Sequence, residues 1–155
     1  MKKREFRENL FKLLYSLDNY NEEEYKEQIA YFLEEENVNE KDGAFITEKL
    51  GKIAEKIEDI DDIIQNKSIG WDISRIARTD LAALRIGIYE ITMDDDVSVK
   101  VAINEAVNLA AAYGTDKSAG FVNGILAAVA KDDSIPKVEK NDRVKDADKE
   151  AESEA

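Results

Sequence analysis

Apolar residues recur at helical spacing along most of this chain, and this periodicity restricts the fold more than any other feature. Spacings of three, four and seven residues predict amphipathic helices. Pro136 is the single proline, and Ala, Leu, Ile, Glu and Lys dominate the sequence, so long helices with short connections are expected. No segment shows convincing strand alternation. The sequence therefore predicts an all-α fold, a compact bundle of about seven helices.

The predicted helices form two groups. The first group lies at about residues 3–18, 22–36 and 42–66. The second group begins with a short helix that includes Trp71, and it continues at about 79–93, 99–113 and 117–129. In the third helix the buried stripe is predicted to contain Phe45, Ile46, Leu50, Ile53, Ile57, Ile60 and Ile64.

These groups predict one domain over residues 1–131, with subdomains at about 1–67 and 68–131. After Asp132 the chain becomes a mixed-charge segment with few large apolar residues. Such a segment buries too little surface to offset the entropy of ordering. Residues 132–155 are therefore predicted to be a disordered tail.

Composition argues against most catalysis. The chain contains no Cys and no His, which removes thiolate chemistry, the commonest general base and the commonest transition-metal ligand. Asp94, Asp95 and Asp96 are typical of an exposed turn, because a calcium loop needs spaced ligands and a glycine. No phosphate loop or nucleophile elbow is present. We expect no enzyme activity, no metal and no cofactor.

No apolar run reaches the roughly 20 residues that span a bilayer. The charged start, MKKREFREN, lacks the apolar segment of a secretory signal. A cytoplasmic protein without a membrane partner is expected.

The net charge of −13 is unevenly distributed. Residues 1–12 hold five basic and two acidic side chains, whereas residues 21–62 hold fifteen acidic and five basic ones. Since phosphate binding depends on Lys and Arg, the first segment is the better candidate to contact nucleic acid, and the second should repel it.

In the first helix, Arg4, Arg7, Glu8 and Phe11 lie on a face adjacent to the apolar stripe. Two guanidinium groups on one side of a rigid helix can contact successive phosphates. Alternatively, basic residues near an N-terminus serve only solubility. The pattern alone leaves both interpretations open.

A glycine-containing turn joins the last two predicted helices. Gly114 can adopt a left-handed conformation that ends one helix, and Asp116 or Ser118 can cap the next. Lys117 adds a positive charge where helix N–H groups favour an anion. Phe121 offers a ring for an unpaired base if it faces outward, but it also fits a core position.

Two polar residues interrupt an apolar helix. Asn104 and Glu105 lie on or beside its apolar face, where polar groups need partners. Arg85 or a neighbouring backbone group is the predicted partner, so both residues are interpreted as structural.

Three segments resemble the NusB family of transcription antitermination factors. They are KREFRENLFKLLYSLD, WDISRIARTDLAALRIGIYEI and VKVAINEAVNLAAAYGTDKSAGFVNGIL. They occur in the family's order and together extend over about residues 3–127. The last two are the more specific, because they place unusual polar residues at fixed positions within long apolar helices.

The resemblance implies a NusB-like fold of two three-helix-like halves and a bacterial, non-catalytic role. It implies a heterodimer with NusE, the small-subunit ribosomal protein, that binds boxA-type single-stranded RNA of ribosomal RNA leaders within the RNA polymerase antitermination complex. By motif, Lys3, Arg4 and Arg7 match the basic N-terminal cluster, next to which Lys2 is a further RNA-binding candidate, and Lys117, Ser118 and Phe121 match the RNA-facing turn. Asp80 corresponds to an acidic position that faces the NusE-like partner, with Arg78 and Glu90 as secondary candidates.

The chain departs from the family pattern at two positions. Glu5 stands within the basic start and opposes phosphate contact, whereas Lys117 replaces a residue that is often acidic and favours it. The alternative function is a helical interaction module whose acidic surface binds a basic protein without RNA. A homodimer in the free state is a further possibility.

Overall fold

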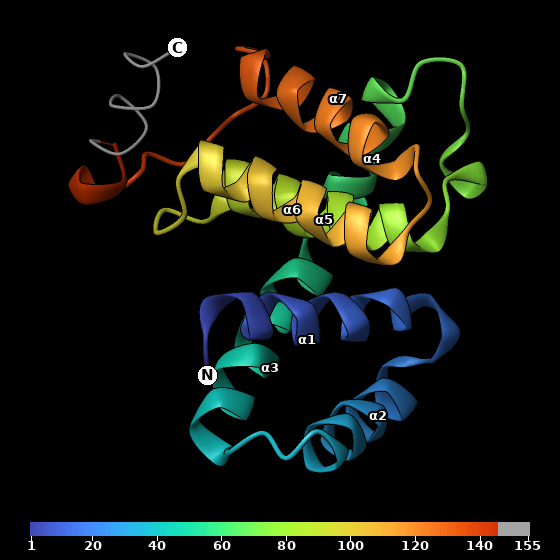
Figure 1. Ribbon diagram of the computed structural model, residues 1–155, viewed down its shortest axis with the longest axis vertical. Coiled ribbons are helices and arrows are strands. Elements are labelled where there is room, and N and C mark those ends of the chain that lie inside the picture. Colours follow the sequence, from blue (N-terminus) through green and yellow to red (C-terminus); the bar gives the residue numbers. More distant parts are fainter. Residues whose placement is uncertain (146–155) are drawn as a thin grey trace. The chain divides into compact units, whose positions relative to one another are not determined.

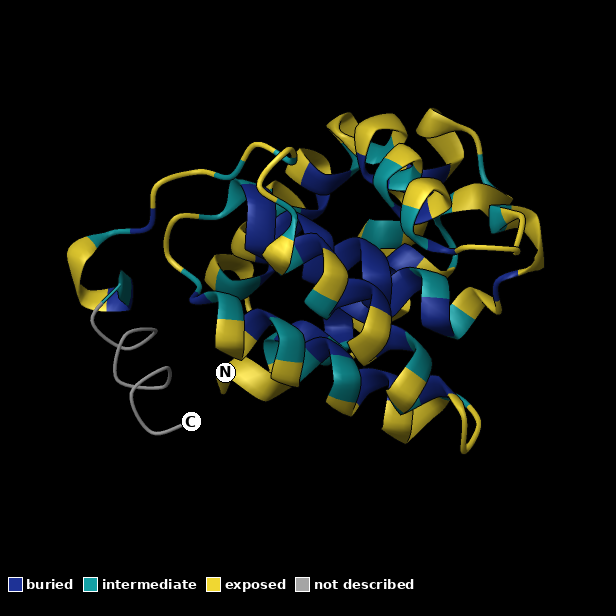
Figure 2. Cartoon of the chain, turned by 90° about the horizontal axis from the view of Figure 1, so that it is seen from above, coloured by how far each residue is buried: buried dark blue, intermediate teal, exposed yellow. Residues whose placement is uncertain are grey.

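The computed structural model describes residues 1–145, all of whose regular elements are helical (Figure 1). The chain divides into two compact units, Met1–Lys56 and a second unit that starts at Ile57. Buried residues, dark blue in Figure 2, occur within each unit. The all-α prediction is confirmed.

The first unit contains α1 (Lys3–Tyr15), a 3-10 turn η1 (Leu17–Asn19), α2 (Glu22–Glu35) and α3 (Glu40–Glu55). The side chain of Asn21 accepts a hydrogen bond from Glu24 N–H, and the Glu24 side chain accepts one from Asn21 N–H. Asn39 caps α3 through Asp42 N–H at 2.8 Å. Such caps satisfy backbone donors that a helix start leaves without partners. Fully buried side chains in this unit are Leu10, Leu14, Ile46, Leu50 and Ile53.

The second unit contains α4 (Ile57–Lys67), a 3-10 turn η2 (Ile73–Arg75), α5 (Arg78–Met93), α6 (Val99–Tyr113) and α7 (Ser118–Lys131). The central helix α5 packs against α4, α6 and α7. Gly87 allows this close packing, because a Cβ atom there would lie 2.7 Å from Leu126 Cδ1 and 3.2 Å from Ala106 Cβ.

Two predicted elements differ from the structure. The helix expected over 42–66 is broken at Lys56, whose N–H bonds back to the carbonyls of Ile53 and Ala54 and ends α3. The short helix is only the 3-10 turn η2, and Trp71 lies exposed before it. Periodicity missed the break because the apolar spacing continues across it.

Phe45 was predicted to be buried and is 61% exposed. In α3 the buried positions are Ile46, Leu50 and Ile53, which follow each other at spacings of four and three. Phe45 precedes this stripe by one residue, a rotation of about 100° on a helix, so its side chain points away from the stripe.

Arg85, the predicted partner of Asn104 and Glu105, forms an ion pair with Asp61. Its guanidinium group holds Asp61 at two points, with Nε 2.9 Å from Oδ1 and Nη2 2.8 Å from Oδ2. This two-point ion pair joins α5 to α4, and Asn104 is exposed on α6. A planar guanidinium group is well suited to a carboxylate partner.

Residues 132–145 depart from the expectation of disorder. The backbone N–H groups of Val138 and Asn141 donate to the carbonyls of Thr92 and Asp95 at 2.8 and 3.0 Å. Lys140 is buried and donates to Glu90 O at 2.6 Å and to Asp94 O. Backbone and lysine hydrogen bonds fix this segment although it carries few apolar side chains. The rest of the predicted tail, residues 146–155, lies outside the described residues.

No helix in the described part of the chain combines the length and apolar character required to cross a membrane.

Candidate nucleic-acid interface

The start of α1 presents a cluster of exposed cations. Lys2 occupies the N-cap position, and Lys3 and Arg4 form the first helical turn. Within residues 1–145, none of these three side chains is ion-paired. Cations near the positive end of the helix dipole destabilise the helix, so these three residues do not serve the stability of α1. This cluster is available to an anion outside the protein.

Arg7 and Phe11 do not share that exposure. Arg7 is 7% exposed and takes part in an interaction within the protein, and Phe11 is buried. Of the two guanidinium groups predicted to contact successive phosphates, that of Arg4 is exposed and that of Arg7 is buried. A face adjacent to the apolar stripe is exposed only where no other element covers it.

An aromatic group that the sequence analysis missed lies beside α1. The rings of Phe6 in α1 and Phe45 in α3 have centroids 4.9 Å apart, and Lys49 Nζ lies 5.9 Å from the centroid of the Phe6 ring. Phe45 is the more exposed of the two rings. Its position outside the buried stripe was the available signal, but only the packing of α3 on α1 shows that the two rings meet.

The turn between α6 and α7 is built differently from the prediction. Gly114 has φ −99°, so it is not left-handed. A Cβ atom at this position would lie 2.3 Å from Ser118 Oγ and 2.7 Å from Ala110 O, and this close approach explains the glycine.

Ser118 stabilises the turn and does not face solvent. It is 2% exposed, and its hydroxyl accepts a hydrogen bond from Thr115 N–H at 2.9 Å. Lys117 stands at the N-cap of α7 without a side-chain cap bond, so neither Asp116 nor Ser118 fills the predicted cap position. Ser118 is therefore not placed to contact RNA directly, and its role is to position the neighbouring residues of the turn.

Lys117 and Phe121 are the accessible members of this turn. Lys117 is exposed and has no ion pair among the described residues, and Phe121 is half-buried in the first turn of α7. A partly exposed ring beside a cation at a helix start combines a stacking surface with a site for phosphate. Lys2, Lys3, Arg4 and Arg7 belong to the first compact unit, whereas this turn belongs to the second.

The three predicted partner contacts have different environments. Asp80 is 8% exposed, and its Oδ1 atom is buried without a hydrogen-bond partner among the described residues. Arg78 is exposed at the start of α5 and interacts within the protein. Glu90 is 0% exposed, so the structure contradicts its assignment to an external surface. It faces inward because α5 is buried along most of its length.

The described residues contain no group of three or more His, Cys, Asp or Glu side chains that could hold a metal ion. The features gathered at these surfaces are cations, partly exposed rings and one buried carboxylate oxygen without a donor. Their chemistry is that of recognition.

Comparison with known proteins identifies similar sequences. The model of the NusB family matches residues 4–131. A transcription antitermination protein NusB from Lachnoclostridium phytofermentans is 42% identical over 130 residues, which cover 83% of this chain and 98% of that protein. Its counterpart from Agathobacter rectalis is 41% identical over 131 residues, with coverage of 84% and 100%.

Solved structures show the same fold. NusB of T. maritima superposes with a TM-score of 0.74 at 30% identity, covering 85% of this chain and 92% of that one. A chain from the crystal structure of antitermination factors NusB and NusE in complex with dsRNA gives a TM-score of 0.71 at 26% identity. That match covers 83% of this chain and 96% of the other.

Proposed function

This chain belongs to the NusB family of transcription antitermination proteins, and we propose that it binds boxA-type single-stranded RNA of ribosomal RNA leaders together with a NusE-like ribosomal protein. The observation that carries the proposal is the family match over residues 4–131. The solved complex of antitermination factors NusB and NusE with dsRNA supports a NusE-like protein partner and RNA as the ligand class. In this role the protein promotes processive transcription as part of an RNA polymerase antitermination complex.

The charge distribution supports RNA binding despite the net charge of −13. Lys2, Lys3 and Arg4 are exposed and without ion pairs among residues 1–145, and Lys117 is exposed beside Phe121. Cations position the RNA through its phosphates, and ring stacking holds an unpaired base. Few groups here can read base edges, so we assign much of the sequence selectivity to the heterodimer.

The environment of Asp80 supports the proposal of a protein partner. A buried carboxylate oxygen without a donor is costly, because it has lost water and gained no hydrogen bond. We propose that the Asp80 carboxylate faces an Arg, Lys or backbone N–H of the NusE-like protein, which supplies a donor to this side chain on binding. Arg78, two residues earlier on α5, is a secondary contact.

We further propose that the protein acts by binding without catalytic turnover, in the cytoplasm. The functional domain is residues 1–131, which the family model matches from residue 4 onward. The boundary expected near residue 67 falls instead at Lys56, because α4 packs on α5 and α7 of the second unit.

The test is fluorescence anisotropy with a boxA-like single strand and a scrambled strand of the same composition, with and without the cognate NusE-like protein. We expect weak binding by this chain alone, and tighter, sequence-selective binding when both proteins are present. Affinity should fall steeply with added salt, because phosphate contacts release counterions.

Two results would contradict the proposal. One is a complex of the two proteins that binds both strands equally. The other is an affinity for the boxA-like strand that stays constant from low to high salt.

A further inference from the structure

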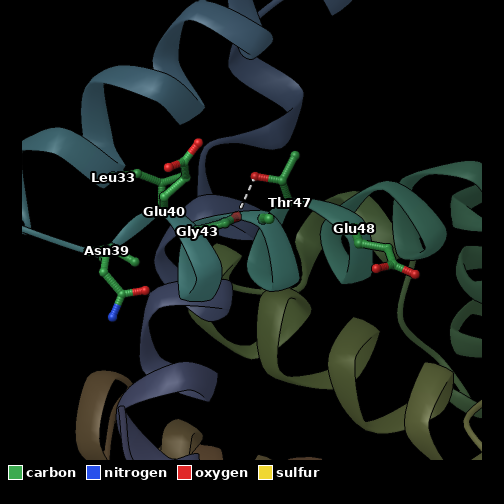
Figure 3. Close-up of a pocket in the computed structure, with 8 residues that line it drawn as sticks. Leu33, Asn39, Glu40, Gly43, Thr47 and Glu48 are labelled. Carbon is green, nitrogen blue, oxygen red and sulfur yellow. Dashed lines mark hydrogen bonds between the residues drawn. The ribbon is translucent and has the colours of Figure 1, made fainter.

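The first compact unit contains an open groove that the RNA-binding role does not use. It lies between the end of α2 and the first half of α3 (Figure 3), and its volume is about 580 Å³. Every lining residue comes from positions 33–48, so the groove belongs to this unit alone.

The inner surface of the groove is mostly apolar. Leu33, Val38, Gly43 and Ala44 line it. Gly43 keeps its floor low, since a Cβ atom there would already lie 3.4 Å from Leu33 Cδ1. Thr47 also lines the groove, but its hydroxyl already donates to Gly43 O at 2.8 Å (Figure 3). The floor therefore suits an apolar side chain.

The groove also carries negative charge. Glu40 and Glu48 line it and stand eight residues apart on α3. Eight residues correspond to a separation of about 12 Å along a helix. Glu40 has no ion pair among the described residues, and Glu48 forms an ion pair with the exposed Lys52 at 3.2 Å. Two carboxylates thus lie along one side of an apolar surface.

The surrounding sequence strengthens this charge. Residues 33–49 contain six acidic and two basic side chains. One of the two cations, Lys49, lies over the Phe6 ring. Nucleic acid is repelled by such a surface, whereas a cationic polypeptide is attracted to it.

We propose that this groove docks a basic segment of a partner protein, in which one bulky apolar side chain lies between two Lys or Arg residues about 12 Å apart. The apolar side chain fills the space over Gly43 and Ala44. The two cations contact Glu40 and Glu48. None of the residues that line this groove is a proposed RNA contact or Asp80, so the groove gives the protein a second docking site.

The probe for this proposal is a fluorescein-labelled helical peptide of 14 residues with an Ala and Gln body, one central Phe, and a Lys four residues to either side. A control peptide of identical composition carries both Lys residues side by side at one end. With the full chain at low salt, we expect the spaced peptide to bind at least fivefold more tightly. Equal binding of the two peptides would overturn the proposal.

Matched variants locate the site. Glu40→Gln with Glu48→Gln should weaken binding of the spaced peptide roughly threefold to tenfold, as expected for two exposed ion pairs. Glu23→Gln with Glu27→Gln makes the same charge change on exposed positions of α2 and should have less than a twofold effect. Equal losses in the two double variants would show attraction by net charge alone and would contradict a built site.

The apolar floor needs its own variant. Ala44→Leu fills the groove and should weaken binding of the spaced peptide at least fivefold. Ala30→Leu, at an exposed position of α2, should leave that binding unchanged. Circular dichroism checks that both variants remain folded. RNA affinity should be unchanged in all of them, which separates this proposal from the RNA-binding role. If the spaced peptide bound the Ala44→Leu variant as tightly as it binds the parent chain, the groove would be ruled out as the binding site.

Discussion

Lys67 Nζ lies 2.5 Å from Asp132 Oδ2, and this ion pair joins the last residue of α4 to the residue that follows α7. Asp132 also accepts hydrogen bonds from the backbone N–H and the hydroxyl of Ser134, at 2.9 and 2.6 Å. These donors favour the ionised carboxylate. They hold the pKa of Asp132 well below its ordinary value of 3.8, with Lys67 as the largest cause.

The ion pair predicts a pH dependence. Because the folded-state pKa of Asp132 is lowered, its contribution to stability is complete above the ordinary, unfolded value of 3.8 and is lost as pH falls through the lower folded value. Lys67→Met should raise the Asp132 pKa, and NMR titration of the carboxyl carbon measures it. Lys131→Met, at the exposed neighbouring position, is the control. An unchanged Asp132 titration in Lys67→Met would refute the assignment.

Lys140 predicts that residues 132–145 stabilise the second unit. Its buried ammonium group donates to the carbonyls of Glu90 and Asp94 at the end of α5. Lys140→Met leaves these carbonyls without that donor and should lower the free energy of unfolding by roughly 1–3 kcal/mol. Urea denaturation followed by circular dichroism measures the change. The exposed control Lys131→Met should change it by less than about 0.5 kcal/mol, and equal effects would show that Lys140 adds nothing specific.

The cations at the start of α1 predict how RNA binding responds to salt. The double variant Lys3→Ala with Arg4→Ala should lower the affinity for all single-stranded RNAs similarly, because phosphates carry no sequence information. The slope of log affinity against log salt should fall in magnitude by about 1.4, or about 0.7 for each lost contact. Lys26→Ala with Lys41→Ala removes the same charge from other exposed positions of this unit. If that control changes the slope equally, general electrostatics and not local contact explains binding.

Phe121 predicts a stacking contribution. Phe121→Leu keeps an apolar side chain in the first turn of α7 but removes the aromatic face. It should reduce RNA affinity about fivefold or more, the effect of losing roughly 1 kcal/mol of base stacking. Phe32→Leu, at another half-buried position, controls for general loosening and should leave affinity unchanged. Parental affinity in Phe121→Leu would assign the ring to packing alone.

Asp80 predicts a variant that separates binding from stability. Asp80→Asn preserves the shape of the side chain but removes the charge that attracts a partner's donor, so affinity for the NusE-like protein should fall at least tenfold in calorimetry. The free chain should not lose stability, because a buried carboxylate oxygen without a donor is itself unfavourable. Asp62→Asn, at an exposed position of α4, is the control. Normal heterodimer affinity in Asp80→Asn would place the interface elsewhere.

The sequence predicted the elements that depend on local periodicity. The positions of α1, α2, α5, α6 and α7 follow from apolar spacings, and the cap of α2 follows from Asn21. Local rules failed where tertiary contacts decide. Phe45 was expected to be buried and is exposed, whereas Arg7 was expected to reach RNA and is buried, because a residue at the border of an apolar stripe is buried only if another element covers it.

The candidate site shows the same division. The sequence placed the cations at the start of α1 and beside the turn before α7, since their positions along the chain are local facts. It could not show that Arg7 and Glu90 are buried, that Ser118 serves the turn, or that Phe6 and Phe45 meet. Each of these depends on which helices pack together.

The sequence by itself thus determined the helical class, the family and the location of the charged segments, because periodicity, motif and charge are properties of neighbouring residues. Only the tertiary structure decided the ion pair of Arg85 with Asp61, the anchoring of Lys140, and the buried oxygen of Asp80 that lacks a donor. Those features arise between residues distant in sequence, where burial strengthens each hydrogen bond that forms and penalises each one that does not.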